Sequence, residues 1–477
     1  ELLLAHAYWR DQQIMIDLVI MNLQDSSYSP DSQEQIHRLI TRANGASWLN
    51  RRGGIFVVNA DQMNAPDRIL LQTAARVILD GDKGALADQL ARIMQVRTFL
   101  PAFMPTLGSA EPVEATPALS RPTDFRFDNG WGGFSADDKQ YALYLQTGQW
   151  TPAPWVNVIA NESFGFLVSE TGASYTWAEN SSQNRLTPWS NDPVTDGAGE
   201  ALYLRDEETA QIWLLMPLPS RDAAPYLIRH GAGYSRFDHH GQGLKQSAHL
   251  FIAPDSPVKI IKLRLENTWS HPRRITVTYY AEWVLGTTRA ASQPYIVPEY
   301  DHDSGALLAR NPYNTEFGER VAFLAANKAP HGLTTDRTEF LGRMGTLSRP
   351  AALNRIGLSS RVEAGGDPCA ALQLHIDLPV GGVEEVYFLL GEGLNRDDAL
   401  QLVRRFQDPA QVEAAWQATH TVWDGILGTV TVHTPDPAMD ILLNRWLLYQ
   451  TLSCRIWGRT GFYQSSGAFG FRDQLQD

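Results

Sequence analysis

Cysteine is scarce in this chain: among 477 residues there are two, Cys369 and Cys454. They lie far apart in the sequence, and neither stands in the spacing of a metal-ligand set. Two isolated cysteines build no disulfide framework, so a reducing compartment fits the chain best. We therefore expect a cytoplasmic location and no metal centre.

Basic charge is also in short supply. The chain has 40 Lys and Arg residues against 53 Asp and Glu residues, which gives a formal net charge of −13. Proteins that bind nucleic acid gather Lys and Arg on one face or along one helix. The charge balance therefore argues against nucleic acid as a partner, although an acidic protein can still bind a phosphate locally.

Long apolar runs are missing, and so is the pattern of a signal peptide. No run of about 20 apolar residues is present that could cross a bilayer. The sequence opens at Glu1 and closes at Asp477, each inside a predicted helix. We expect both ends to be internal to a longer protein, in which case any anchoring to the inner membrane depends on segments outside this sequence.

The motifs of several common catalytic sites are absent. The sequence has no Gly-x-Ser-x-Gly elbow, Walker loop, His-Glu-x-x-His pair or zinc-type cysteine pair. His239-His240 is predicted to lie in a surface turn, with metal binding as the lesser alternative. Residues 130–134 predict a glycine-dependent tight turn beside an aromatic core, with a ligand loop as the alternative. No cofactor is expected.

Tryptophan, in contrast, is plentiful. The chain contains 14, and eight of them fall between Trp131 and Trp283. Such enrichment is typical of a sandwich core and also occurs in carbohydrate-binding surfaces.

Short strands without a long helix between them run through residues 125–392 and predict a large antiparallel β-sandwich. Clear examples lie at 141–145 and 260–265. We expect residues 277–284 to form a half-buried strand, and residues 267–272 to form the hairpin turn that precedes it.

The region before the sandwich has a different pattern. Residues 1–98 alternate helices and strands, which predicts parallel βα units and the tail of an upstream domain. Residues 99–124 read as an extended, Pro-rich linker. Ser32 is predicted to cap a helix. The expected elements are helices over 2–13, 32–43, 68–79 and 83–94, and strands over 16–21 and 54–60.

The region after the sandwich is predicted to be helical. Residues 393–428 form a helical linker, with helices over 396–406 and 411–427. Residues 429–433 then predict a short strand. Residues 438–456 carry apolar side chains at helical spacing and predict a long core helix, so residues 429–477 are expected to begin an all-helical domain.

Three polar and aromatic segments are candidates for a saccharide site. Residues 149–161 form one aromatic loop, and residues 184–193, with Arg185, Trp189 and Asp192, form another. Turn residues that stabilise the corners of the sandwich are the alternative interpretation of both loops.

The third segment is the last one, in which Arg472, Asp473 and Asp477 follow a Gly-broken loop. A bidentate Arg and an Asp can hold adjacent sugar hydroxyls for reaction. A buried Arg–Asp ion pair between helices is the alternative, because Arg472 and Asp477 lie near the same helical face.

Several of these motifs resemble a known family. Residues 129–134, 150–155, 186–193 and 282–287, and the closing segment 443–477, occur in the same order in the carboxy-terminal part of bacterial cyclic β-1,2-glucan synthases. That part is similar to the inverting disaccharide phosphorylases of glycoside hydrolase family 94, which include cellobiose and chitobiose phosphorylases. Residues 1–98 resemble the segment just upstream in the synthases.

The resemblance implies a β-sandwich, a helical linker and the beginning of an (α/α)6 barrel within 429–477. It also implies phosphorolysis, in which inorganic phosphate is the co-substrate and α-glucose 1-phosphate the product. Carried over to this sequence, Arg472 and Asp477 would hold the donor glucose, with Asp473 and Gln474 in support. Arg459 is a further candidate near the phosphate, and the general-acid Asp is expected beyond residue 477.

On this resemblance, the chain is part of an enzyme that acts on β-1,2-glucan or gluco-oligosaccharides and controls glucan chain length. We expect the piece alone to be inactive. By analogy with the family we also expect a homodimer. Two alternatives stay open: a free-standing oligoglucan or disaccharide phosphorylase, and a carbohydrate-binding or scaffold module without chemistry.

Overall fold

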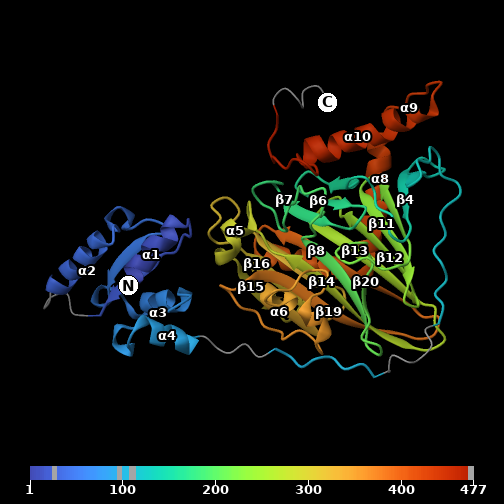
Figure 1. Cartoon of the computed structure of the whole chain (residues 1–477). Coiled ribbons are helices and arrows are strands. Elements are labelled where there is room, and N and C mark those ends of the chain that lie inside the picture. The colour runs from blue at the N-terminus through green and yellow to red at the C-terminus, as the bar shows by residue number, and fades with distance from the viewer. Residues whose placement is uncertain (24–29, 94–98, 107–113, 471–477) are drawn as a thin grey trace. The chain divides into compact units, whose positions relative to one another are not determined.

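The computed structural model describes residues 1–23, 30–93, 99–106 and 114–470, which fall into two compact units, 1–98 and 99–477 (Figure 1). The predicted residues Arg472, Asp473, Gln474 and Asp477 lie outside the described part. Among the described helices, none combines the length and the hydropathy that a membrane crossing requires.

The first unit alternates helices with strands, as the sequence predicts. Strands β1 and β2 are parallel neighbours, in register from Leu18 opposite Ile55 to Asn22 opposite Asn59. The elements are α1 (Leu2–Asp11), β1 (Leu18–Asn22), α2 (Pro30–Arg42), β2 (Ile55–Asn59), α3 (Ala65–Ala74) and α4 (Leu86–Ile93).

Two details of the prediction for this unit are wrong. Helix α2 begins at Pro30, so Ser32 lies inside its first turn and is not the N-cap. Helix α3 begins earlier than expected because the Asn64 side chain accepts a hydrogen bond from Asp67 N at 2.8 Å. It ends at Ala74, since Ala75 turns to an extended conformation.

The second unit confirms the predicted β-sandwich. It contains a ten-stranded, a five-stranded and a three-stranded sheet, and the strand pairs within them are antiparallel. The ten-stranded sheet has the order β15 (Val297–Asp301), β16 (Ala306–Arg310), β17 (Val321–Ala326), β20 (Val383–Gly393), β13 (Val258–Asn267), β12 (Leu244–Ile252), β11 (Tyr234–Gly241), β10 (Tyr226–Gly231), β4 (Gln140–Leu145) and β3 (Gly132–Phe134).

The two smaller sheets complete the sandwich, and α5 (Arg289–Ser292) and α6 (Arg337–Leu341) are the short helices between its strands. The five-stranded sheet has the order β18 (Gly332–Asp336), β19 (Pro368–Leu378), β14 (Arg273–Glu282), β8 (Glu200–Asp206) and β9 (Ile212–Leu214). The three-stranded sheet consists of β5 (Val156–Ala160), β6 (Phe164–Ser169) and β7 (Ser174–Ala178).

Several tryptophans pack in the core of the sandwich, which is one of the two roles expected from their abundance in the sequence. Trp177, Trp213 and Trp283 are each at most 4 % exposed. The core also contains Leu263 from β13 and Tyr279 from β14, so side chains of the ten-stranded and five-stranded sheets meet in one apolar layer.

The expected hairpin at residues 267–272 is wrong. Strand β13 pairs with β12 and β20, whereas β14 pairs with β8 and β19, so the turn carries the chain from one sheet to the other. Strand β14 is also buried on both faces rather than half-buried. Its outer face is covered by α6, where Tyr280 stacks on Phe340 at 4.6 Å between ring centroids.

A buried ion pair joins the three sheets. Lys259 on β13 donates to the Glu200 carboxylate on β8 at 2.6 Å, and both side chains are at most 4 % exposed. Hydroxyls of Thr176, Thr187 and Tyr279 also donate to this carboxylate. Burial alone raises the pKa of Glu200, but the Lys259 ammonium and these hydroxyls hold it below its usual value. The pair is therefore fully hydrogen-bonded, as a buried charge requires.

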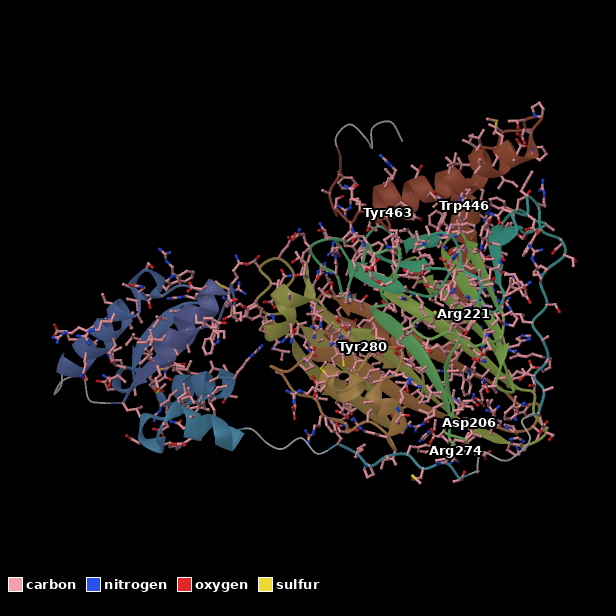
Figure 2. The ribbon with its side chains drawn as sticks, viewed as in Figure 1. Asp206, Arg221, Arg274, Tyr280, Trp446 and Tyr463 are labelled. Carbon is pink, nitrogen blue, oxygen red and sulfur yellow. The ribbon has the colours of Figure 1, made fainter. Side chains whose placement is uncertain are left out.

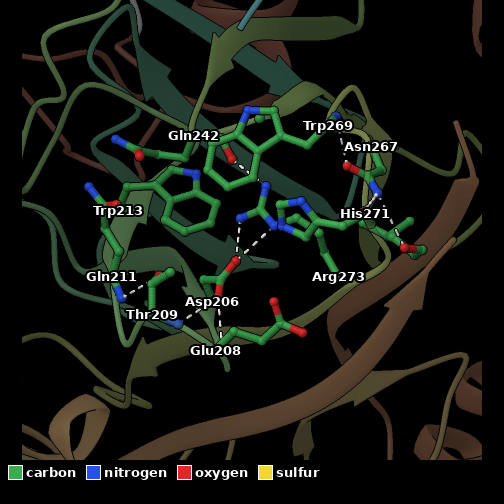
Figure 3. Close-up of polar contacts among 12 residues, drawn as sticks. Asp206, Glu208, Thr209, Gln211, Trp213, Gln242, Asn267, Trp269, His271 and Arg273 are labelled. Carbon is green, nitrogen blue, oxygen red and sulfur yellow. Dashed lines mark hydrogen bonds and ion pairs between the residues drawn. The ribbon is translucent and has the colours of Figure 1, made fainter. Parts of the chain in front are cut away.

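A second buried pair ties β8 to β14 at one end of the sandwich. Asp206 accepts hydrogen bonds from two nitrogens of Arg273, whose guanidinium lies 4.1 Å from the Trp269 ring (Figure 3). Figure 2 shows Asp206 and Arg274 at the end of the sandwich opposite Trp446 and Tyr463. This cluster stabilises the fold far from the closing segment of the chain.

The described part of residues 99–124 is extended, as predicted, and it contacts the sandwich along its length. Phe103 N donates to Asn354 O at 2.9 Å, and the Glu114 carboxylate accepts from Ser270 N at 2.9 Å. Tyr144 donates to Leu119 O at 2.8 Å.

The helices after the sandwich form as predicted. The two helices are α7 (Arg396–Gln407) and α8 (Pro409–Leu427). Asn395 and Asp408 are their N-caps, and the side chains of both accept hydrogen bonds from backbone N–H groups. Residues 429–433 do not form a strand, because their backbone pairs with the Asn444 side chain instead: Val432 N and O each lie 2.8 Å from its amide.

Three loop predictions are also settled. His239 and His240 lie within β11 and not in a surface turn. In the segment 149–161, residues Val156–Ala160 are strand β5, so the loop is shorter than predicted. The predicted tight turn is confirmed at Gly130, which has φ +95°, but residues 132–134 form strand β3, where a Cβ on Gly132 would lie 1.8 Å from Ala142 O.

Candidate functional site

A helical run carries the chain across one end of the sandwich, next to β6 and β7 (Figure 1). It comprises α9 (Pro437–Ile441), a π-helical stretch (Leu442–Trp446), α10 (Leu447–Gln450) and a second π-helical stretch (Thr451–Trp457). The Asp436 side chain caps its start by accepting from Ala438 N at 2.9 Å. The predicted long helix is therefore present, with two wider turns.

One side of this run is fixed to the sandwich. Tyr449 is 1 % exposed and donates to Asn157 Oδ1 and Val158 O of β5, both at 2.8 Å. Its ring packs edge-on against Trp423 of α8 at 4.7 Å between centroids. On the other side of the run, the following apolar side chains remain 40–50 % exposed, and no described residue covers them: Met439, Leu442, Leu443, Leu447 and Leu448.

The run ends in a compact loop, residues 458–470. Arg459 has φ +51° and Gly467 has φ +64°, so the chain reverses at both places. Thr460 and Ser465 form an isolated antiparallel bridge, and Gly467 N donates to Arg459 O at 3.2 Å. We call these residues the closing loop.

The sandwich holds the closing loop through strand β7 and the residues that follow it. Tyr175 makes hydrogen bonds to the hydroxyls of Thr460 and Ser465. Asn180 donates to Gly467 O at 3.2 Å, and Ser465 donates to Ser181 O at 2.7 Å. The start of the closing loop and its end are therefore attached to the same surface.

Arg185 is the central residue of this contact. Its guanidinium donates to Ser181 O at 3.1 Å, to Thr287 O at 2.8 Å and to the Ser465 hydroxyl at 3.2 Å. The Trp189 ring lies 5.0 Å from the guanidinium, and Trp189 Nε1 donates to Gly461 O at 3.4 Å. Burial lowers the pKa of Arg185.

Arg459 is a second arginine in the same cluster. It donates to Glu179 O at 2.8 Å, and its guanidinium lies 4.7 Å from the Phe469 ring. Its Nε is buried and has no hydrogen-bond partner among the described residues. Within the described part of the chain, neither Arg459 nor Arg185 forms an ion pair with a carboxylate. Two guanidinium groups thus lie at the closing loop with no carboxylate partner among the residues that the structure describes.

A buried carboxylate beside this cluster belongs to Glu392 at the end of β20. It is 2 % exposed and accepts from Asn184 Nδ2 at 2.9 Å, with Arg320 Nη1 at 3.4 Å. Burial raises the pKa of Glu392 to about 7. Arg320 also pairs with Glu179 at 2.8 Å. These groups fix the residues that hold the closing loop.

The structure brings together three of the residues predicted from sequence, namely Arg185, Trp189 and Arg459. Asp192 is not part of the cluster, because its carboxylate is exposed and accepts from Val194 N and Thr195 N of its own loop. In the segment 184–193, Arg185 and Trp189 contact the closing loop, while Asp192 stabilises a turn, as the alternative interpretation predicts.

Sequence reasoning missed several residues of the cluster, namely Tyr175, Asn180, Ser181, Glu392 and Ser465. Tyr175 lies in an alternating strand, where a core role is the default expectation. The pair Ser465-Ser466 before Gly467 was the available signal, since small polar residues beside glycine are typical of tight hydrogen-bonded loops.

The cluster can bind an anion rather than a metal ion. Among the described residues, no group of three or more His, Cys, Asp or Glu side chains is placed to hold a metal. Guanidinium groups match phosphate oxygens through paired N–H donors. Exposed aromatic rings flank the loop, with Tyr463 and Phe469 each 64 % exposed.

Comparisons with known proteins cover both the sandwich and the helical run. Residues 139–409 match the family model described as glycosyl hydrolase 94, supersandwich domain. Residues 422–477 match the model described as glycosyl hydrolase 94 superfamily, catalytic domain.

Three curated relatives are similar to the chain. The cyclic β-(1,2)-glucan synthase NdvB of Rhizobium meliloti is 37% identical over 491 residues, which cover 100% of this chain and 17% of that protein. The N,N'-diacetylchitobiose phosphorylase of Vibrio furnissii is 28% identical over 73% of this chain and 44% of its own length. The solabiose phosphorylase of Paenibacillus borealis is 27% identical over 73% of this chain and 45% of its own. The chain thus spans less than half the length of each.

Proposed function

The chain belongs to the glycosyl hydrolase 94 family, and from this we propose that it forms part of an enzyme that cleaves a β-glucan by inverting phosphorolysis. The resemblance seen in the sequence is thereby confirmed at the level of the family. Among the relatives, two are named phosphorylases and one a cyclic β-(1,2)-glucan synthase. A β-1,2-linked glucan is the substrate that we propose.

The observation that carries the proposal is the pair of guanidinium groups at the closing loop, Arg185 and Arg459, for which the described part of the chain supplies no carboxylate partner. A buried charge without a counter-ion is costly, and a bound anion offsets that cost. In a protein with a net charge of −13, two such cations in one cluster support binding of a dianionic co-substrate. Inorganic phosphate fits this requirement, whereas hydrolysis by water does not call for it.

The proposed reaction joins a phosphate oxygen to the anomeric carbon of the terminal glucose while the glycosidic C–O bond breaks. A carboxylic acid donates its proton to the leaving oxygen, and the products are α-glucose 1-phosphate and a glucan shortened by one unit. Because phosphate is the nucleophile, a single protein carboxylate suffices, unlike the two of an inverting hydrolase. No residue of this chain is assigned as that acid.

In this proposal Arg472 and Asp477 hold the hydroxyls of the donor glucose, with Asp473 and Gln474 in support. Arg459 contacts the phosphate, and Arg185 positions the closing loop through Ser465. Removal of terminal glucose units would control chain length in glucan synthesis. The alternatives are a free-standing oligoglucan or disaccharide phosphorylase and a binding module without chemistry.

The test compares the full-length gene product with this 477-residue chain, each given phosphate and a linear β-1,2-gluco-oligosaccharide. We expect glucose 1-phosphate from the full-length protein and none from the chain alone. Replacing Arg459 by Met should raise the KM for phosphate about tenfold or more, in line with the loss of a charge-assisted contact. Arg274→Met is the matched control, because Arg274 pairs with Asp377 at the opposite end of the sandwich (Figure 2).

Three results would contradict the proposal. An unchanged KM for phosphate in Arg459→Met would remove its assigned contact. Release of glucose rather than glucose 1-phosphate would replace phosphorolysis by hydrolysis. Glucan binding without any turnover in the full-length protein would favour the binding module.

A further inference from the structure

One tryptophan of the sandwich is far more exposed than those in its core. Trp150 has 48 % of its surface exposed, whereas Trp177 and Trp213 are at most 4 % exposed. It lies in the connection between β4 and β5, within the aromatic loop that the sequence marked as a saccharide candidate. A single exposed aromatic side chain is ordinary by itself, so its surroundings decide what it does.

The backbone around Trp150 is held rigidly. Trp131 Nε1 donates to Trp150 O at 2.8 Å. Arg221, labelled in Figure 2, donates to the carbonyl oxygens of Gln149 and Gln146, and its guanidinium lies 5.0 Å from the Trp150 ring. An indole that is fixed in place and still exposed loses little entropy when a ligand packs against it.

The other end of the loop is also anchored. The buried Glu170 carboxylate accepts from Trp155 N at 2.7 Å and from the Thr151 hydroxyl. Glu170 N in turn donates to Trp155 O at 3.1 Å. Hydrogen bonds therefore hold the segment that carries Trp150 both before and after this residue.

An open hollow begins at Gln149, immediately before Trp150. Its volume is about 330 Å³, at the lower end of the roughly 300–1,000 Å³ of ligand pockets. Gly130 and Gly148 have no atom within 4 Å of where a Cβ would lie, so nothing fills the space above them. The lining residues are Arg121, Gly130, Tyr144, Gln146, Thr147, Gly148 and Gln149.

The polar groups of the hollow suit a neutral ligand. The Arg121 guanidinium is already paired with the Asp128 carboxylate at 2.7 Å, so it carries no unneutralised charge. The Gln146 side chain is exposed and makes no hydrogen bond to another described residue, which leaves an amide donor and acceptor available. The hollow thus differs from the closing loop, where two guanidinium groups have no carboxylate partner among the described residues.

We propose that Trp150 and this hollow form an accessory binding site for a neutral oligosaccharide, which shares no residue with the closing loop. The apolar face of a pyranose ring packs on the exposed indole, and the next sugar hydroxyls reach the amide of Gln146. That the oligosaccharide is a β-1,2-glucan rests on the proposed function. The site would hold a distant part of a long glucan while its end reacts elsewhere.

The experiment measures binding of a linear β-1,2-gluco-oligosaccharide to this chain by calorimetry, without phosphate. Trp150→Ala should weaken binding about tenfold, the effect of losing part of an aromatic contact surface. Gln146→Ala should weaken it by a smaller factor. Since Trp150 is exposed and its loop is held by backbone contacts, the melting temperature of Trp150→Ala should equal that of the wild type.

Phe99→Ala is the matched control. Phe99 is 46 % exposed and has an arginine, Arg355, at 4.2 Å from its ring, but it does not line the hollow. Binding by Phe99→Ala should equal that of the wild type. Equal binding by Trp150→Ala and wild type, or no binding by the wild type, would overturn the site.

The outcome is separable from that of the proposed function. Glucose 1-phosphate release reports on the closing loop, and the difference in glucan binding between Trp150→Ala and wild type reports on the hollow. If phosphorolysis fails but Trp150→Ala still weakens glucan binding, the accessory site stands alone. If phosphorolysis is observed and Trp150→Ala binds like the wild type, only the accessory site is wrong.

Discussion

The buried Lys259–Glu200 pair gives the sharpest prediction on stability. Replacing Lys259 by Met removes the only cation that contacts the Glu200 carboxylate among the described residues and leaves it with three hydroxyl donors. Removal of one partner from a buried ion pair costs about 3–5 kcal/mol. We expect Lys259→Met to lower the free energy of unfolding by about this amount near neutral pH.

The cost should depend on pH, because the stranded carboxylate can take up a proton. Without Lys259 the folded-state pKa of Glu200 rises above its unfolded value of about 4.3. A raised folded pKa gives stability that is present below the unfolded pKa and is lost as pH rises. As pH falls from about 7 to 4.5, the loss of unfolding free energy in Lys259→Met should therefore shrink by up to about 1.4 kcal/mol for each pH unit.

Urea unfolding followed by tryptophan fluorescence measures both effects, since all tryptophans except Trp9 and Trp48 lie in the unit that contains the sandwich. The double variant Lys259→Met/Glu200→Gln is the control, because it removes both charges and should recover most of the lost stability. A loss below about 1 kcal/mol near neutral pH, or a loss that does not change with pH, would refute the account.

Two further predictions concern the attachment of the closing loop. Burial raises the pKa of Glu392 to about 7, so the contribution of this carboxyl group to stability should decline as pH rises from about 4.5 to 7. Glu392→Gln should therefore gain stability relative to wild type over this pH range. A relative loss of stability, measured by urea unfolding, would contradict this. Gly467→Ala should destabilise the loop by about 1–3 kcal/mol, because φ is +64° and the new Cβ would lie 2.0 Å from Asn180 Oδ1. Limited proteolysis should then cut the closing loop faster, whereas unchanged cleavage would mean that the contact with Asn180 is unimportant.

Much of the fold follows from local patterns in the sequence. Short strands separated by turns predict the sandwich correctly, and the helices predicted over 396–406 and 411–427 form as α7 and α8. Sheet membership does not follow from such patterns. The turn residues at 267–272 are equally suited to a hairpin and to a crossover between sheets, because turn chemistry fixes the local bend and not the partner strand.

The same limit explains two further errors, one about the burial of β14 and one about the strand expected at 429–433. Strand β14 alternates in sequence, but α6 covers its second face, and that contact joins residues distant in the chain. Residues 429–433 have β-forming side chains, yet the Asn444 amide takes up the backbone of Val432. In both cases a tertiary partner overrode the local preference.

The candidate site shows the limit most clearly. Arg185 is a candidate from its aromatic loop, and Arg459 is a candidate from the family resemblance. Their meeting depends on β7 and the helical run reaching the same end of the sandwich, which no spacing along the chain encodes. Their lack of carboxylate partners within the described structure is visible only in three dimensions, and it is this property that supports an anion site.

The sandwich holds the closing loop mainly through the loop's backbone, which leaves many of the loop's side chains uninvolved in fixing its path. Side chains of the sandwich donate to backbone carbonyls of the loop, so the path of the loop does not depend on most of the side chains that it carries. Tyr463, Gln464 and Phe469 remain exposed and free to differ between proteins that bind different sugars. The exceptions are the side chains of Arg459, Thr460 and Ser465, which form hydrogen bonds to the sandwich, and Gly467, because the Asn180 side chain occupies the space of its missing Cβ. The sandwich therefore acts as the fixed wall of the proposed site, against which a change of loop side chains can alter specificity without a change of fold.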